Sequence, residues 1–115
     1  MRPGSLNERC NGCWLFNFGV GLHLLEGSPP ARPKEICPEA DHFSFECADI
    51  SEVERQLRAL DVEYLKDEIE HESGVLISQL FFHDPDDNTI EVCTCDSAPL
   101  EFLQTGGRRH NVSVL

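Results

Sequence analysis

Three polar residues interrupt apolar runs of this 115-residue sequence: His23 in LHLL, His42 in DHFSF and Glu91 in TIEVC. Each lies in a segment typical of a β-strand, where a buried polar side chain needs a partner. Two imidazoles and one carboxylate form a ligand set that suits zinc, iron, nickel or manganese. Three protein ligands also leave coordination positions open for water or a substrate, as a catalytic metal site requires. Taken singly, each histidine could instead be half-exposed, and Glu91 could face solvent.

The elements that would position His42 begin with HFSFEC, residues 42–47, which alternates polar and apolar side chains and predicts a strand. A helix is predicted next, because apolar side chains recur at the spacing of one helix face: Ile50, Val53, Leu57 and Leu60. Ser51 and Glu54 have the spacing of a capping box at the start of this helix. The charged residues on its other face are expected to be solvated.

Three further strands are predicted after the helix, in residues 62–69 (VEYLKDEI), 75–82 (VLISQLFF) and 89–95 (TIEVCTC). The last two flank HDPDDN, whose turn-forming residues predict a hairpin. Ahead of residue 42 the sequence predicts two short strands within residues 13–26, followed by a Pro-rich connector. Several strands combined with one helix indicate an α+β fold.

The register of the predicted hairpin decides which side chains share a face with Glu91. If the two strands pair symmetrically about Asp86, Gln79 and Phe81 lie on the same face of the sheet as Glu91. A β-bulge in the loop would reverse this arrangement and turn Glu91 to the opposite face.

Six cysteines raise the question of disulfides or of a zinc site. CNGC places Cys10 and Cys13 at the C-x-x-C spacing of zinc sites, and Cys93 and Cys95 could complete four thiolates. However, C-x-C within a strand puts both sulfurs on one face and lacks the knuckle turn of a zinc ribbon. In a reducing compartment, buried free thiols are the expected state of these cysteines.

Composition limits the classes of partner. A formal net charge of −12 argues against nucleic acid or an anionic membrane surface, since phosphate contacts need clustered Lys and Arg. No apolar run approaches the roughly 20 residues that span a bilayer. The first residues also lack the hydrophobic stretch of a signal peptide. We therefore expect a cytoplasmic domain without a nucleic-acid or membrane partner.

Three segments resemble the vicinal oxygen chelate superfamily, also called the glyoxalase/bleomycin resistance/dioxygenase superfamily: WLFNFGVGLHLLEG, DHFSFEC and VLISQLFFHDPDDNTIEVC. The most specific part is the FFHDPDxNxIEVC pattern. The resemblance extends over residues 13–96 and is greatest to short plant proteins of the glyoxalase, lactoylglutathione-lyase-like, family. It implies βαβββ modules that pair to form a cup around a divalent metal ion.

Carried onto this chain, the resemblance implies one domain in residues 1–103. Residues 13–26 would be the last two strands of a first module, 27–41 a linker, and 42–96 a complete second module. The front of the first module would lie ahead of Met1, so the cup is expected to lack two strands and a helix. A second copy of the chain could cover the exposed edge in a homodimer. Residues 104–115 are expected to form a disordered tail.

The resemblance also implies the roles of individual residues. His23, His42 and Glu91 would be ligands of a divalent metal ion, namely zinc, nickel, manganese or iron. Glu91 would in addition act as the catalytic base, because metal-bound carboxylates transfer the proton in sites of this type. Gln79 and Phe81 would line the substrate pocket.

The function implied by the resemblance is a metal-dependent lyase or isomerase that acts on a small α-oxo compound or a glutathione adduct. Two alternatives remain open: a small-molecule-binding module without turnover, as in bleomycin-resistance relatives, and an extradiol-type dioxygenase that uses iron. The chain departs from the family pattern at Asp87, where DPDG usually supplies glycine. That position commonly needs a positive φ, which Asp adopts less readily than Gly.

Overall fold

The structure is a computed structural model that describes residues 11–17, 19–70, 72–95 and 109–114. The chain divides into two compact units, Met1–Ala31 and Arg32–Leu115. The boundary between the two units falls within the predicted connector, residues 27–41. No helix among the described residues is long and apolar enough to cross a membrane.

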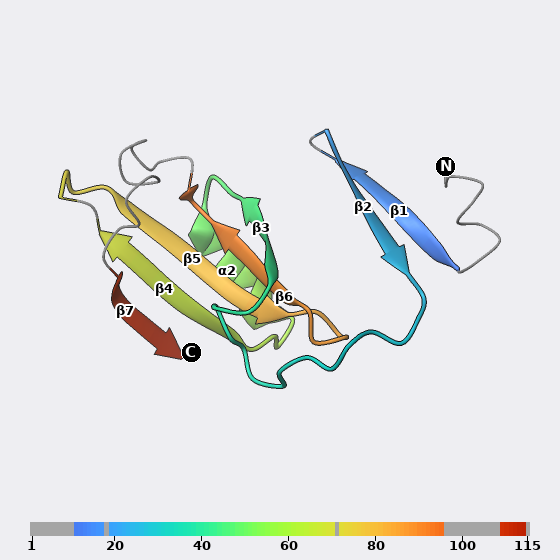
Figure 1. The fold of residues 1–115 in the computed structure, drawn as a ribbon. Coiled ribbons are helices and arrows are strands. Elements are labelled where there is room, and N and C mark those ends of the chain that lie inside the picture. Colours follow the sequence, from blue (N-terminus) through green and yellow to red (C-terminus); the bar gives the residue numbers. More distant parts are fainter. Residues whose placement is uncertain (1–10, 18, 71, 96–108, 115) are drawn as a thin grey trace. The chain divides into compact units, whose positions relative to one another are not determined.

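The first unit contains an antiparallel hairpin of β1 (Gly12–Asn17) and β2 (Val20–Leu25), shown in blue in Figure 1. Gly19 has a φ of 73° in the turn, a conformation that costs glycine little. The register places Trp14 directly opposite His23, so the two side chains share one face of the hairpin. The two short strands predicted for residues 13–26 are therefore present.

The second unit contains one five-stranded sheet in the order β3-β6-β5-β4-β7, together with helix α2 (Ile50–Ala59). The strands are β3 (His42–Glu46), β4 (Tyr64–Glu70), β5 (Leu76–His83), β6 (Thr89–Cys93) and β7 (Arg109–Val114). Strand β3 pairs with β6 in parallel, and the other neighbouring strands are antiparallel. The predicted order of strand, helix and three strands is confirmed from β3 to β6 (Figure 1).

Strand β7 differs from the disordered tail expected for residues 104–115. Arg109–Val114 pairs with β4, whose edge would otherwise present unpaired backbone groups. Pairing along an open sheet edge gives a polar segment a defined structure that its composition does not reveal. The other residues of the predicted tail lie outside the described part of the chain.

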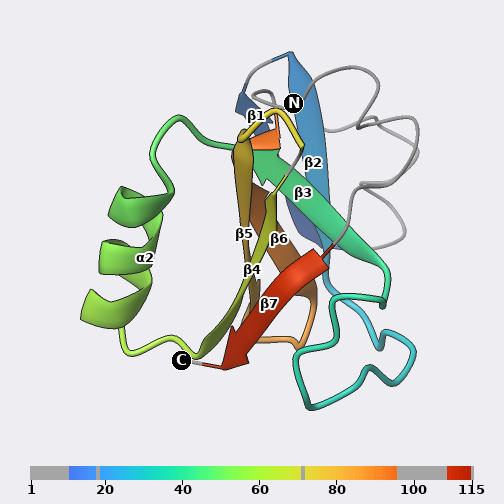
Figure 2. The same ribbon diagram turned by 90° about the vertical axis from the view of Figure 1, so that its left-hand side faces the viewer.

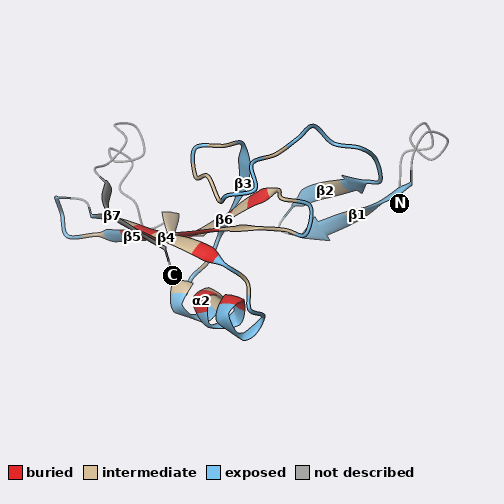
Figure 3. Ribbon diagram, turned by 90° about the horizontal axis from the view of Figure 1, so that it is seen from below, coloured by how far each residue is buried: buried red, intermediate tan, exposed pale blue. Residues whose placement is uncertain are grey.

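Helix α2 covers one face of this sheet, as Figure 2 shows. The core between them contains Leu57 of the helix, Tyr64 of β4 and Leu80 of β5, with exposed fractions of 6%, 2% and 0%. Leu60, predicted to lie on the apolar stripe, is instead 73% exposed at the C-cap, because the helix ends at Ala59. Figure 3 shows the buried residues where α2 faces the sheet.

The start of the helix differs from the predicted capping box of Ser51 and Glu54. The N-cap is Asp49, whose carboxylate accepts a hydrogen bond from the backbone N–H of Ser51 at 2.9 Å. Glu54 is consequently one turn inside the helix and points toward the sheet. It accepts hydrogen bonds there from the Tyr64 hydroxyl at 2.8 Å and from the Arg58 guanidinium at 2.6 Å.

Glu54 gives a prediction for the pH dependence of stability. Burial raises the pKa of its carboxyl, but hydrogen bonds from Tyr64 and Lys66, with the charges of Lys66 and Arg58, outweigh burial and lower the pKa below 4.5. Ionised Glu54 therefore stabilises the fold above pH 4.5, and this contribution is lost as the pH falls through the lower, folded-state pKa. We expect Glu54→Gln to reduce the free energy of unfolding at pH 7 by about 1–3 kcal/mol.

Urea unfolding of the wild type and the Glu54→Gln variant at several pH values measures this difference. The deficit of the variant should shrink as the pH falls below 4.5, the ordinary pKa of the carboxyl. A deficit that stays constant down to pH 3, or increases there, would contradict this account of Glu54.

The loop between β5 and β6 is organised by Asp84. Its carboxylate accepts hydrogen bonds from the backbone N–H groups of Asp86 and Asn88, each at 2.9 Å. Asp87 has a φ of 62°, which agrees with the positive φ expected where the family pattern has glycine. Its carboxylate also contacts the Lys34 ammonium at 2.5 Å.

A matched pair of variants measures the backbone cost at Asp87. Asp87→Gly and Asp87→Ala both remove the contact with Lys34 and both keep residue 87 at a positive φ, but only alanine has a Cβ atom that makes this conformation costly. We expect the glycine variant to be more stable than the alanine variant by about 1 kcal/mol, measured by thermal or urea unfolding. Equal stabilities would mean that the loop relaxes out of this conformation.

Candidate metal site

The face of the sheet opposite α2 carries most of the residues predicted for the site. Phe81 of β5 lies opposite Glu91 of β6, which is the register symmetric about Asp86. Ser44 of the neighbouring β3 is the partner of Glu91 on its other side, so His42 and Gln79, two residues along their strands, belong to the same face.

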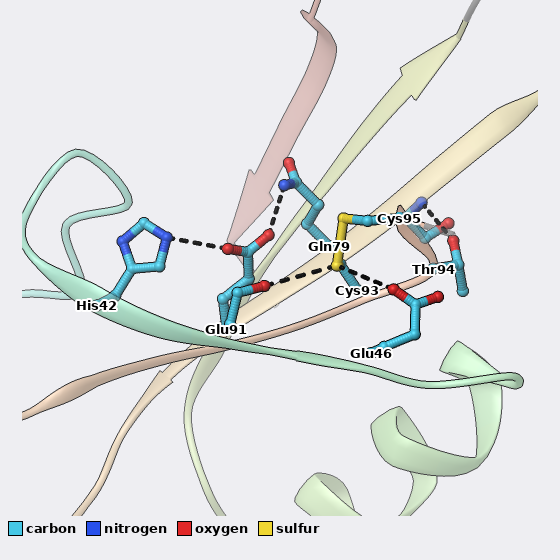
Figure 4. Close-up of a disulfide and its surroundings, with 9 residues drawn as sticks. His42, Glu46, Gln79, Glu91, Cys93, Thr94 and Cys95 are labelled. Carbon is cyan, nitrogen blue, oxygen red and sulfur yellow. Dashed lines mark hydrogen bonds and ion pairs between the residues drawn. A yellow bond between two sulfur atoms is a disulfide. The ribbon is translucent and has the colours of Figure 1, made fainter. Parts of the chain in front are cut away.

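Glu91 is 5% exposed and is held by two side chains (Figure 4). Its Oε2 lies 2.9 Å from Nε2 of His42, and its Oε1 accepts a hydrogen bond from Nε2 of Gln79 at 2.5 Å. A buried carboxylate requires such partners, because desolvation of an unpaired charge is costly. Glu91 therefore does not face solvent, which was the alternative left open by the sequence.

His42 has a defined orientation. Its Nδ1 lies 2.7 Å from the carbonyl oxygen of Ala40, and a carbonyl can only accept, so Nδ1 carries a proton and donates it. Its ring also meets the edge of Phe81, with centroids 5.5 Å apart and planes at 87°. The remaining nitrogen, Nε2, is directed at the Glu91 carboxylate.

This geometry suits a divalent metal ion. Metal-bound histidines commonly donate one ring N–H to a carbonyl or carboxylate, which leaves the other nitrogen for the metal. His42 has this arrangement, with Ala40 as the acceptor. An imidazole nitrogen and a carboxylate oxygen that face each other are also donor types that divalent transition metals bind. The donor set thus fits the predicted ligand roles of His42 and Glu91.

His23 lies in the first unit, on β2. Its ring stacks on Trp14 with centroids 4.1 Å apart and planes at 6°. Its Nε2 is buried and has no hydrogen-bond partner among the described residues. A nitrogen without a partner is compatible with a ligand role, but the place of His23 in the ligand set stays a prediction.

Sequence reasoning missed two features of this face. Asp67 of β4 is 1% exposed and lies opposite Gln79, which makes it a second buried carboxylate on the face. The signal was available, since Asp67 separates Leu65 from Ile69 in the alternating pattern of VEYLKDEI.

The second missed feature is a disulfide between Cys93 and Cys95. Buried free thiols were expected for these two residues, so this expectation is wrong for them. The physical reason is the spacing already noted: C-x-C at a strand end brings both sulfurs to one side. The rival zinc cluster included Cys10, which lies outside the described residues, while Cys13 is an exposed free thiol. Free thiols are present at Cys37 and Cys47 as well.

A mixed sheet with one helix on one face, and a histidine paired with a buried carboxylate on the other, defines a small α+β protein of the βαβββ type. No family model matches the sequence. The chain is 44% identical over 102 residues to Glyoxylase I 4 of Arabidopsis thaliana. The aligned region covers 86% of this chain and 57% of that protein, so the chain spans little more than half the length of this curated relative.

Solved structures show the same fold. A putative glyoxalase family protein from Bacillus anthracis superposes with a TM-score of 0.58 at 22% identity, over 81% of this chain and 68% of that one. A glyoxalase family protein from Enterococcus faecalis gives a TM-score of 0.56 at 25% identity, over 76% and 70% of the two chains. The sequence similarity to Glyoxylase I 4 and the fold shared with glyoxalase family proteins support assignment of the chain to the vicinal oxygen chelate, or glyoxalase, superfamily.

Proposed function

We propose that the chain is a metal-dependent lyase or isomerase of glyoxalase type, acting on a small α-oxo compound or its thiol adduct. The observation that carries the proposal is the pair of the exposed His42 and the buried Glu91, whose Nε2 and Oε2 atoms face each other at 2.9 Å. The similarity to Glyoxylase I 4 supports the same class of reaction.

His42 Nε2 and the Glu91 carboxylate would hold the metal ion. When bound, the ion would stabilise negative charge on a substrate oxygen. The Glu91 carboxylate would accept the proton from the carbon next to the substrate carbonyl and return it to the neighbouring carbon. Gln79 would orient this carboxylate through its hydrogen bond to Oε1. Phe81, 2% exposed, would supply an apolar wall that limits access of water.

The charges near the site favour a small substrate over glutathione itself. Glutathione carries two carboxylates, which basic side chains usually bind. Lys66 lies on the helix side of the sheet and contacts Glu54 at 3.3 Å, and Lys34 contacts Asp87. Neither lysine is therefore assigned to a carboxylate of the substrate. We expect thiol adducts of an α-oxo aldehyde made with a neutral thiol to be accepted as well as the glutathione adduct.

The test is turnover by the full chain after chelation and reloading with zinc, nickel, manganese or anaerobic ferrous iron. Formation of thioester from both adducts is expected with at least one metal, and Glu91→Gln should abolish it. Glu52→Gln, an exposed helix residue, is the matched control and should retain activity. Tight binding of the adduct without turnover under every metal would overturn the proposal in favour of a binding module. Oxygen consumption that requires ferrous iron would overturn it in favour of a dioxygenase.

The setting of this activity is also part of the proposal. We place the chain in the cytoplasm and expect a second copy as its partner. Support for the second copy comes from large apolar side chains of the β1–β2 hairpin that are about half exposed or more: Leu15, Phe16, Val20 and Leu25.

A further inference from the structure

We propose that Cys93, Cys95 and Glu46 form a second cation site, specific for a thiophilic divalent ion such as Zn²⁺ or Cd²⁺ and opened by reduction of the disulfide. The donor atoms of the three residues all lie within 4.8 Å of one another. Figure 4 shows the disulfide beside the Glu46 carboxylate.

The sulfur of Cys93 lies in a polar setting that a disulfide alone does not require. It is 3.8 Å from Oε2 of Glu46 and 3.6 Å from the hydroxyl of Ser44. Cys93 itself is 2% exposed, whereas Glu46 lies at the exposed edge of the sheet. The site is therefore accessible to an ion from the side of Glu46, and its inner ligand is shielded from water.

The backbone holds the cysteine segment against its neighbours on both sides. The carbonyl of Cys93 accepts a hydrogen bond from the N–H of Cys47 at 2.8 Å. The N–H of Thr94 donates to the carbonyl of Ser78 at 3.1 Å, and the N–H of Ser78 donates to the Thr94 hydroxyl at 3.1 Å. Because these bonds do not involve the sulfurs, they can hold the two cysteines near Glu46 after the disulfide is reduced.

Two thiolates and a carboxylate select the class of ion. Thiolate ligands favour zinc and other soft cations, while calcium and magnesium favour oxygen ligands. Three protein ligands leave a fourth tetrahedral position for water. The bound ion also compensates the charge of Glu46 and of both thiolates, in a protein whose formal net charge is −12.

The redox step is a thiol–disulfide exchange. Two equivalents of a monothiol reduce the Cys93–Cys95 bond, which yields two cysteine thiols and one disulfide of the monothiol. A divalent ion then binds two thiolates and the Glu46 carboxylate, and the two thiol protons are released to water. In the oxidised protein the two sulfurs are bonded to each other, so the thiolate ligands do not exist.

This site is separate from the pair of His42 and Glu91, although both lie on the same face. Cys93 is paired with Glu46 in the β3–β6 register, whereas Glu91 is paired with Ser44. The two sites share no ligand. Loss of one is therefore expected to leave the other in place.

The test uses the ultraviolet absorption band that arises when thiolates bind Cd²⁺. The full chain is reduced with a phosphine, freed of reductant under nitrogen and titrated with Cd²⁺. The four other cysteines, Cys10, Cys13, Cys37 and Cys47, are replaced by serine to remove their contribution. One Cd²⁺ per chain is expected to produce the band, and the same protein with its disulfide intact should produce none.

Variants assign the ligands. Cys95→Ser should abolish the band, and Glu46→Gln should weaken Cd²⁺ binding by at least about 10-fold, the lower end of what loss of a supporting residue costs. His42→Ala should leave the band unchanged, which distinguishes this site from the one proposed for catalysis. Absence of the band in the reduced protein, or its persistence in a Cys93→Ser/Cys95→Ser variant, would overturn the proposal. If the variant with four cysteines replaced by serine does not fold, the reduced and oxidised wild-type proteins are compared instead. A Cd²⁺ band of equal intensity in both would then overturn the proposal.

Discussion

Replacing His42 by alanine is expected to weaken binding of Zn²⁺ or Ni²⁺ by more than the roughly 10–100-fold that loss of a supporting residue costs. The imidazole presents Nε2 to the Glu91 oxygen at 2.9 Å while Nδ1 donates to Ala40, so one preorganised ligand is removed. Glu91→Ala should cause a loss of similar size. Competition with a chromophoric chelator, carried out on the oxidised protein, measures these affinities without a contribution from Cys93 and Cys95.

The control for this series is Phe43→Ala. Phe43 is the next residue on β3, and its side chain lies on the opposite face of the sheet and is 59% exposed. This variant should bind metal with the affinity of the wild type. If His42→Ala and Phe43→Ala weakened metal binding equally, the effect would come from disturbance of strand β3 and not from loss of the imidazole ligand.

The largest effect on stability is expected at Leu80. This side chain is 0% exposed, on β5, and packs with Leu57 and Tyr64 beneath the helix. Leu80→Ala removes buried apolar surface and leaves a cavity, which typically costs about 2–5 kcal/mol of unfolding free energy. Since a small domain has only about 5–15 kcal/mol of stability, this variant should unfold at a much lower temperature or urea concentration.

Leu76→Ala is the matched control for Leu80→Ala. It makes the same chemical change on the same strand and the same face, but Leu76 is 50% exposed. Its cost should be close to the roughly 0.5 kcal/mol typical of surface substitutions. Similar costs for the two variants, measured by urea unfolding, would contradict the assignment of Leu80 to the core.

The residue pattern was sufficient to predict strands β1 to β6 and the common face of three site residues on β5 and β6. Alternation in HFSFEC and VLISQLFF, with the turn in HDPDDN, predicts a common face for Gln79, Phe81 and Glu91, and the structure has this arrangement. The substitution at Asp87 likewise indicated a positive φ. These features are local, because strand period and turn geometry depend on neighbours in sequence.

Features that depend on tertiary contacts were not predictable in the same way. Glu54 has the spacing of a capping-box residue, but Tyr64 and Lys66 on β4 recruit its carboxylate to the core side of the helix. Strand β7 forms through pairing with β4, which its sequence does not indicate. The approach of Cys93 to Glu46 requires β3 and β6 to be neighbours, and these strands are far apart in sequence.

The most direct test of the proposed metal site is a ¹⁵N NMR titration of the histidine side chains with Zn²⁺, on full-length oxidised protein. Among the five histidines, His42 is expected to show a metal-bound Nε2 and to keep its proton on Nδ1, as the hydrogen bond to Ala40 requires. Glu91→Gln should weaken the affinity for Zn²⁺ and should reduce the change in the His42 signal to the same extent. An unchanged His42 signal at saturating Zn²⁺, with any other histidine responding in its place, would contradict the account.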